Sequence, residues 1–292
     1  MKGAHDNMKC FDIPLQVETT GKGDYDAYMT VYAPSNGLDL HINKNRPAVV
    51  IFPGGAYCIT YDGEAEPIAL KFVAEGAVAA VVWYSTKHKC TEKMVRWPQA
   101  LAEGLLAVGY LRDHAAELGI DPENIATLGF SAGGHLCGCT GTMWNHSVMD
   151  PYLPGDRTKY RPDKFFLCYA VLTSKRPYHR GSYAALLGDK NMTEEMLEML
   201  SLENQIGAHT PPAFIWHTFS DPSVPVQGPL LFAKTMADHK IPCEVHIYPQ
   251  GGHGLCLANH VTSDAYPANQ PYYPAEWIDH AVAFLFNKTI GK

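Results

Sequence analysis

The feature that most constrains the fold is a serine placed between two glycines where an apolar run meets the start of a helix. Residues 125–130 are largely apolar and lead into Gly129-Phe130-Ser131-Ala132-Gly133, a G-x-S-x-G pattern. On a tight strand-to-helix turn the serine backbone is strained and its Oγ projects outward. Positions without a Cβ on either side let the strand and the helix approach each other. The pattern predicts Ser131 as a nucleophile, and the alternative is a glycine-rich turn that binds phosphate.

Strands and helices alternate along the rest of the chain. Apolar runs typical of buried strands lie before and after the serine, at 47–52, 78–83, 165–172 and 213–219. A last strand is expected at 244–248. Helical patterns lie between or after them at 66–75, 97–118, 194–200 and 276–286. An antiparallel hairpin is expected near the amino terminus, where 15–18 pairs with 28–32 across a glycine-containing turn. The alternation predicts an α/β fold, with a mostly parallel central sheet flanked by helices on both faces.

We expect residues 1–292 to form a single domain, because no repeat or linker interrupts the pattern. Two segments depart from the strand-helix rhythm, at about 141–162 and 173–211. Ligands of open α/β sheets bind beyond the carboxyl ends of the strands, where such excursions shape the pocket.

The charge of the chain argues against two classes of partner. The net charge is −7 with no block of like charges, which disfavours nucleic acid and anionic membrane surfaces. No segment has the length of a membrane span and the amino terminus has no apolar signal region, so we expect a cytoplasmic protein. A metal site at His135, Cys137 and Cys139 is disfavoured, because residues two apart on a helix point in different directions. We therefore expect no metal and no cofactor.

A serine nucleophile needs a base, and the base needs an acid that orients it. After such a turn the expected chain order is serine, acid, histidine. His253 lies in a glycine-flanked loop after the last strand, and Asp221 follows the strand at 213–219, so these two are the predicted base and acid. His217, inside that strand, is expected to be a packed core histidine. The N–H of Ala132 and those of Gly54 and Gly55, which follow another buried strand, are the predicted oxyanion donors.

Four segments together resemble the acetyl esterase/lipase group of the α/β-hydrolases, close to acetyl-xylan-esterase-like carbohydrate esterases. They are Phe52-Pro53-Gly54-Gly55-Ala56-Tyr57, Gly129 to Leu136, Phe214 to Thr218 with Asp221, and Gly251-Gly252-His253-Gly254-Leu255. The resemblance runs from about Val49 to Leu255. It implies an α/β-hydrolase fold and ester hydrolysis, whereas it specifies the substrate poorly.

Aromatic residues concentrate in the excursions and in the tail after His253, and flat rings suit sugar stacking. Tyr57, Tyr183 and Trp277 are the predicted substrate contacts. The alternative for these aromatics is a subunit interface in a homo-oligomer. The leading hypothesis is a serine esterase that removes short acyl groups, chiefly acetyl, from a small-molecule carbohydrate ester. An amidase or peptidase with the same triad and a non-catalytic binding protein of this fold are the alternatives.

Overall fold

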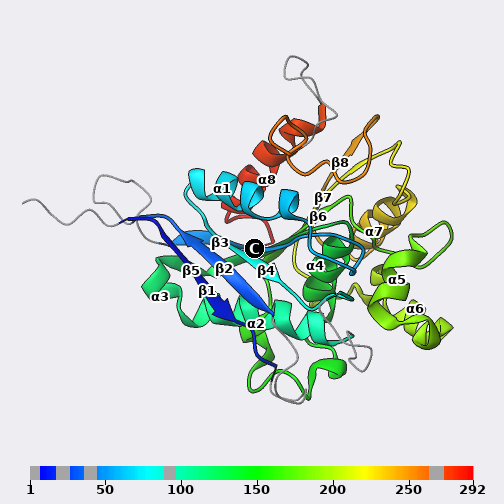
Figure 1. Ribbon diagram of the computed structural model, residues 1–292, viewed down its shortest axis with the longest axis horizontal. Helices are drawn as coiled ribbons and strands as arrows, with labels where there is room; N and C mark the ends of the chain where they lie inside the picture. The colour runs from blue at the N-terminus through cyan, green and yellow to red at the C-terminus, as the bar shows by residue number, and fades with distance from the viewer. Residues whose placement is uncertain (1–6, 18–26, 36–44, 89–96, 263–272, 292) are drawn as a thin grey trace, which may run out of the picture.

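One eight-stranded sheet organises the protein (Figure 1). The computed structural model describes residues 7–17, 27–35, 45–88, 97–262 and 273–291. The strands are β1 (Lys9–Pro14), β2 (Tyr28–Ala33), β3 (Arg46–Phe52), β4 (Val78–Trp83), β5 (Ile120–Phe130), β6 (Lys164–Cys168), β7 (Ala213–Thr218) and β8 (Cys243–Tyr248). They lie in the order β1-β2-β4-β3-β5-β6-β7-β8. From β4 to β8 every neighbouring pair is parallel, which confirms the predicted mostly parallel sheet.

The amino-terminal hairpin is confirmed, although its first strand lies earlier than predicted. β1 pairs antiparallel with β2, from Lys9 opposite Ala33 to Pro14 opposite Tyr28. Residues 15–17 do not form the strand, and Glu18 lies outside the described residues. The N–H of Leu15 donates to the carbonyl of Ala27 at 2.9 Å, one position beyond the last pair of β1 and β2. The predicted turn at 21–24 lies outside the described residues.

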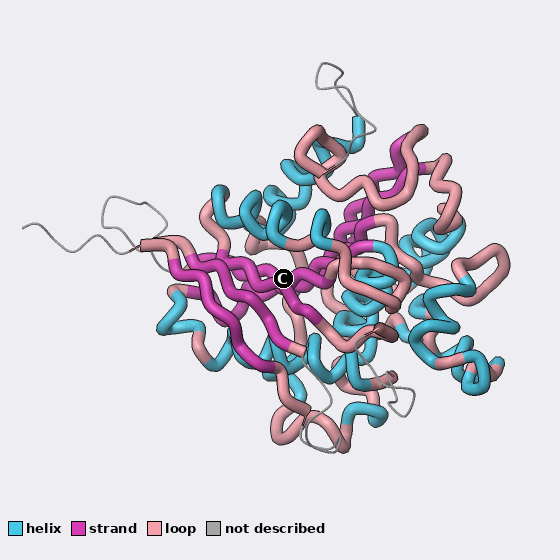
Figure 2. The backbone as a smooth tube through the Cα atoms, viewed as in Figure 1, coloured by secondary structure: helices cyan, strands magenta, loops and turns pink. Residues whose placement is uncertain are grey.

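Helices cover both faces of the sheet, as Figures 1 and 2 show. They are α1 (Glu66–Ala74), α2 (Gln99–Asp113), α3 (Ala115–Leu118), α4 (Ser131–Met143), α5 (Arg180–Leu187), α6 (Glu194–Met199), α7 (Gln227–Asp238) and α8 (Trp277–Phe286). The side chains of α1 and α8 share a core with one face of the sheet, and those of α2, α3, α4 and α7 share a core with the other. In the described part of the chain, no helix combines the length and the apolarity that crossing a membrane requires.

The central strands are apolar on both faces, as their sequence predicts. Within β3, Ala48, Val50 and Phe52 belong to one core and Val49 and Ile51 to the other. This alternation with a period of two residues follows from the pleat of a strand. It explains why a run without polar residues is a strand buried between two helical layers.

Two predicted elements end differently in the structure. The helix expected over 97–118 is divided at His114 into α2 and α3. The apolar run 165–172 is a strand only as far as Cys168, because the next residue, Tyr169, has a φ of +37° and turns the chain away from the sheet. Such a value is uncommon for a residue with a side chain and indicates a position that its surroundings determine.

Candidate active site

The turn between β5 and α4 presents Ser131 as the sequence predicts. Ser131 is the first residue of α4, and its φ is +52°. A Cβ at Gly129 would lie 2.1 Å from the carbonyl oxygen of Gly133, and a Cβ at Gly133 would lie 2.2 Å from that of Phe52. Both distances are far below any real contact, so the close approach of strand and helix requires glycine at these two positions. The strained turn raises the serine side chain above the carboxyl end of β5.

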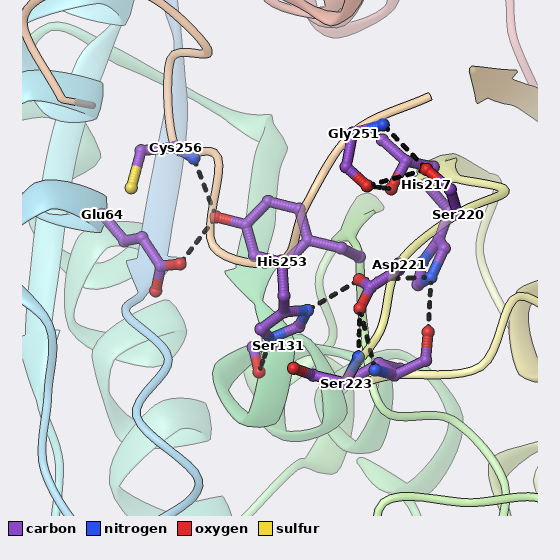
Figure 3. Close-up of polar contacts among 12 residues, drawn as sticks. Glu64, Ser131, His217, Ser220, Asp221, Ser223, Gly251, His253 and Cys256 are labelled. Carbon is purple, nitrogen blue, oxygen red and sulfur yellow. Dashed lines mark hydrogen bonds and ion pairs between the residues drawn. The ribbon is translucent and has the colours of Figure 1, made fainter. Parts of the chain in front are cut away.

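The structure brings together the three side chains that were predicted to act as a unit (Figure 3). His253 Nε2 lies 2.8 Å from Ser131 Oγ, and His253 Nδ1 lies 2.7 Å from Asp221 Oδ2. Asp221 lies in the loop after β7 and His253 in the loop after β8. With Nδ1 protonated and facing the carboxylate, Nε2 accepts the serine proton. This arrangement can make a serine hydroxyl nucleophilic.

Asp221 is held as an ionised acceptor. Its Oδ1 accepts hydrogen bonds from the N–H groups of Ser223 (2.8 Å) and Val224 (2.9 Å). Burial alone would raise the pKa of Asp221, but the hydrogen bond and charge of His253 and these two N–H groups outweigh it, so the pKa lies below its usual value. His217 is fully buried behind it, donates Nε2–H to the carbonyl of Val224, and has a pKa lowered by burial. A neutral core histidine, as predicted, supports the aspartate.

The loop that carries His253 is fastened to the end of β7. The carbonyl of Gly251 accepts hydrogen bonds from Thr218 Oγ1 and Ser220 Oγ, each at 3.1 Å. The N–H of Gly251 donates to Ser220 Oγ at 3.0 Å. Because Asp221 follows Ser220 directly, these bonds fix the acid loop and the histidine loop to each other.

The segment Gly54-Gly55, called the oxyanion segment below, lies against the serine, but one of its predicted donors already makes another hydrogen bond. A Cβ at Gly54 would lie 3.0 Å from Ser131 Cβ. The N–H of Gly54, however, donates to Glu64 Oε2 at 2.6 Å, so it cannot serve an oxyanion without losing that bond. The structure thus corrects the prediction that the N–H of Gly54 is an oxyanion donor, because the buried carboxylate of Glu64 accepts a hydrogen bond from it. Gly55, whose φ is +128°, and Ala132 remain as the predicted donors.

The predicted substrate contacts Tyr57, Tyr183 and Trp277 are buried, with exposures of 2%, 1% and 0%. Tyr57 Oη lies 2.8 Å from His135 Nδ1, and Trp277 Nε1 donates to the carbonyl of Cys256 at 2.9 Å. Side chains without exposed ring faces cannot stack on a sugar. The structure corrects these three predictions and gives the residues packing and hydrogen-bonding roles.

His135 uses both ring nitrogens inside the protein rather than on a metal. Its Nε2 donates to the carbonyl of Leu200 at 2.9 Å, so Nδ1 accepts the hydrogen bond from Tyr57. Cys137 Sγ contacts Thr127 Oγ1 instead of His135. Among the described residues, side chains placed to share a metal ion are grouped at one other position, Glu244, His246 and His280 on β8 and α8.

Acidification is expected to destabilise the protein through His135. Burial lowers the pKa of His135 from 6.5 to about 4, so the unfolded chain binds this proton first as the pH falls. Stability contributed by the neutral form is therefore lost between pH 6.5 and about 4, a cost of about 3 kcal/mol.

Urea unfolding of wild type and His135→Gln at pH 7 and pH 4 measures this difference. The free energy of unfolding of His135→Gln should be lower than that of wild type at pH 7, and it should fall less between pH 7 and pH 4. The exposed His239→Gln should lose as much free energy of unfolding between pH 7 and pH 4 as wild type does. An equal loss in all three proteins would contradict the assignment to His135.

Two residues of the site escaped sequence reasoning. Glu64 lies in a polar loop before α1, where an acidic residue usually indicates solvent exposure, yet it is 2% exposed. Tyr169 lies in an apolar run that reads as strand throughout, yet its Oη donates to Glu64 Oε1 at 2.6 Å. Neither residue carries a local sequence signal for its role.

Comparison with known proteins identifies the family of this chain. The family model BD-FAE matches residues 29–236. Endo-1,4-beta-xylanase B of Butyrivibrio fibrisolvens is 37% identical over 214 residues, which cover 73% of this chain and 33% of that protein. Acetylxylan esterase of Xylanibacter ruminicola is 28% identical over 241 residues, covering 80% of this chain and 44% of that protein. The chain thus spans between a third and a half of these two relatives.

A solved structure matches over nearly its full length. The acetyl ester-xyloside bifunctional hydrolase from Caldicellulosiruptor lactoaceticus has a TM-score of 0.76 and 31% identity, with 97% of each chain covered. An α/β hydrolase from a Medee basin deep-sea metagenome library has a TM-score of 0.74 and 30% identity, covering 96% of this chain and 97% of that one. The esterases among these relatives support assignment to the carboxylic-ester hydrolases. The chain belongs to the BD-FAE family and is an α/β-hydrolase.

Proposed function

We propose that this protein is a serine esterase that removes acetyl groups from a carbohydrate. The observation that carries the proposal is the continuous hydrogen-bonded series from Ser131 Oγ through His253 to Asp221. An ionised carboxylate, a correctly oriented imidazole and a hydroxyl on a strained turn form the usual machinery of acyl transfer in this fold.

The geometry supports the following sequence of steps. His253 Nε2 takes the proton of Ser131 as Oγ attacks the carbonyl carbon of the ester. The negative charge that forms on the carbonyl oxygen faces the N–H groups of Gly55 and Ala132. His253 then gives its proton to the departing alcohol, which leaves an acetyl group on Ser131. Water, deprotonated by His253, attacks this acyl-enzyme, and acetate departs as Ser131 recovers its proton.

The carbohydrate part of the proposal comes from the relatives. One is an acetylxylan esterase, one a xylanase, and one an acetyl ester-xyloside bifunctional hydrolase. A small acetylated sugar is thus the substrate class that we propose. An amidase using the same three residues is the competing activity, because its first step differs only in the leaving group.

Acetylated xylo-oligosaccharides and peptide amides, assayed side by side, test this choice. We expect acetate release from the sugars and no cleavage of the amides, because an amine is a poorer leaving group than an alcohol and an amide carbonyl is less electrophilic than that of an ester. Released acetate and new amino groups are measured in the same reactions. Amide cleavage at a rate comparable to deacetylation would favour the amidase.

Acyl-chain length gives a second test. Ser131 is only 8% exposed, and Tyr57, which follows the oxyanion segment, is fixed by His135. A nucleophile with so little exposed surface should exclude long acyl chains, because steric exclusion costs far more than the about 1 kcal/mol lost with each methylene contact. For p-nitrophenyl esters, we expect kcat/KM to be highest for acetate, low for butyrate and at least about 100-fold below acetate for octanoate. Octanoate cleavage as fast as that of acetate would exclude a deacetylase with a small acyl site.

A further inference from the structure

A second buried carboxylate lies beside the triad, and the mechanism above does not use it. Glu64 ends the short helix Asp62–Glu64, just before α1, and is 2% exposed. In Figure 3, Glu64 lies on the opposite side of His253 from Asp221. A buried carboxylate is costly unless hydrogen bonds compensate it, so its retention next to a reactive site calls for an explanation.

Each oxygen of Glu64 is bonded to a different part of the site. Oε2 accepts the N–H of Gly54, at the start of the oxyanion segment, and Oε1 accepts the hydroxyl of Tyr169, both at 2.6 Å. Charge-assisted hydrogen bonds of this length are among the stronger ones in proteins. Burial raises the pKa of Glu64, whereas the two donors and the charge of His253 oppose that rise.

Tyr169 extends the connection to the histidine loop. Its hydroxyl also accepts the N–H of Cys256, three residues after His253, at 3.1 Å. Its ring packs edge-on against the imidazole of His253, with centroids 5.1 Å apart and planes at 72°. The φ of +37° at Tyr169 places the ring between the two loops. The bonds Gly54–Glu64–Tyr169–Cys256 thus form a bridge between the oxyanion segment and the loop of His253.

We propose that Glu64 is a positioning residue for ester hydrolysis, which holds the oxyanion donors and His253 in a fixed relation on the two sides of Ser131. The inference rests on the proposed esterase function. Acyl transfer needs both elements at once: the base removes a proton while the donors receive the new charge. A displacement of about 1 Å in such an arrangement lowers a rate by about 100-fold. The bridge fixes the segment that contains Gly55 without using the N–H of Gly55 itself.

Four variants test the bridge on p-nitrophenyl acetate, with kcat expressed per site titrated by a fluorophosphonate. Glu64→Ala removes the bridge and should lower kcat by about 30-fold or more with KM within about threefold of wild type. Glu64→Gln can accept from Gly54 and donate to Tyr169 Oη, so it should recover most of that loss. Tyr169→Phe keeps the ring but removes the hydroxyl that links Glu64 to Cys256. Its kcat per site should lie between those of Glu64→Ala and Glu64→Gln. The exposed Glu66→Ala, two residues away, is the matched control and should behave as wild type.

The outcomes separate positioning from simple structural support. A residue needed only for stability would reduce the number of titratable sites but leave kcat per site unchanged. A folded Glu64→Ala enzyme with kcat per site within twofold of wild type would overturn the proposal, as would Glu64→Gln that is as slow as Glu64→Ala. If Glu64→Ala does not fold, Tyr169→Phe carries the test, and a wild-type kcat per site in that variant would overturn the proposal. Absence of turnover by the wild-type protein would instead refute the esterase function on which the inference rests.

Discussion

Replacement of Ser131 by alanine is expected to lower kcat/KM for an acetyl ester by roughly three orders of magnitude or more, with the fold unchanged. Alanine keeps the Cβ of serine, so the turn between β5 and α4, with its φ of +52°, is left as it is. What disappears is the Oγ that lies 2.8 Å from His253 Nε2. The oxyanion donors remain, which is why some rate above that in water should persist.

Two measurements check the Ser131→Ala result. Circular dichroism and thermal unfolding should match the wild type, and a fluorophosphonate probe should label the wild-type protein at Ser131 but leave the variant unlabelled. A folded variant that turns over acetyl esters at near-normal rates would refute the triad. A wild-type protein that is neither labelled by the probe nor able to turn over any ester would point to the non-catalytic alternative.

Replacement of Gly133 by alanine should have the second large effect. The added Cβ would lie 2.2 Å from the carbonyl oxygen of Phe52 and 2.4 Å from that of Pro53, both of them backbone atoms. Backbone cannot rotate aside as a side chain can, so α4 must move away from the end of β3. We expect a loss of about 3 kcal/mol or more in the free energy of unfolding. Because that movement separates Ser131 from the oxyanion segment, kcat/KM should fall by about 100-fold or more.

Gly181→Ala is the matched control for this substitution. Gly181 is an exposed helical glycine of α5, and its added Cβ would meet nothing closer than 3.4 Å. Alanine in a helix is favoured over glycine by up to about 1 kcal/mol, so stability should stay the same or rise slightly. Urea unfolding and kcat/KM of the two variants give the comparison. A Gly133→Ala protein as stable and active as Gly181→Ala would mean that the turn tolerates a side chain.

Much of the fold was predictable because its signals are local. The central strands are nearly continuous apolar runs, and the expected ranges 47–52 and 78–83 correspond to β3 (Arg46–Phe52) and β4 (Val78–Trp83). Strands that are buried on both faces leave no room for polar residues, so their limits are visible in the sequence. The three residues proposed to act in catalysis were also predictable, since each follows a strand whose end was recognised.

What sequence reasoning missed depends on contacts between distant segments. Nothing near Gly54 indicates that Glu64, ten residues later, takes its N–H, and nothing near Glu64 points to Tyr169. The aromatic residues were misjudged for the same reason, because the residue type of Trp277 suits an exposed stacking surface as well as a core. The packing of Trp277 against Trp216, with ring centroids 5.2 Å apart, places it in the core.

The position of β8 has a consequence for how activity appears and disappears. β8 pairs with β7 alone among the described strands, and most of its residues are partly exposed, whereas β5, which leads to Ser131, lies inside the sheet. Edge elements open locally at lower free energy than central ones. Because the proposed base His253 follows β8, we expect a refolding chain to gain activity only after β8 has joined the sheet. We also expect a chain under mild denaturant to stop turning over while most of its amide protons are still protected. Loss of turnover thus indicates local opening at the edge strand β8, whereas spectroscopic signals indicate unfolding of the central strands.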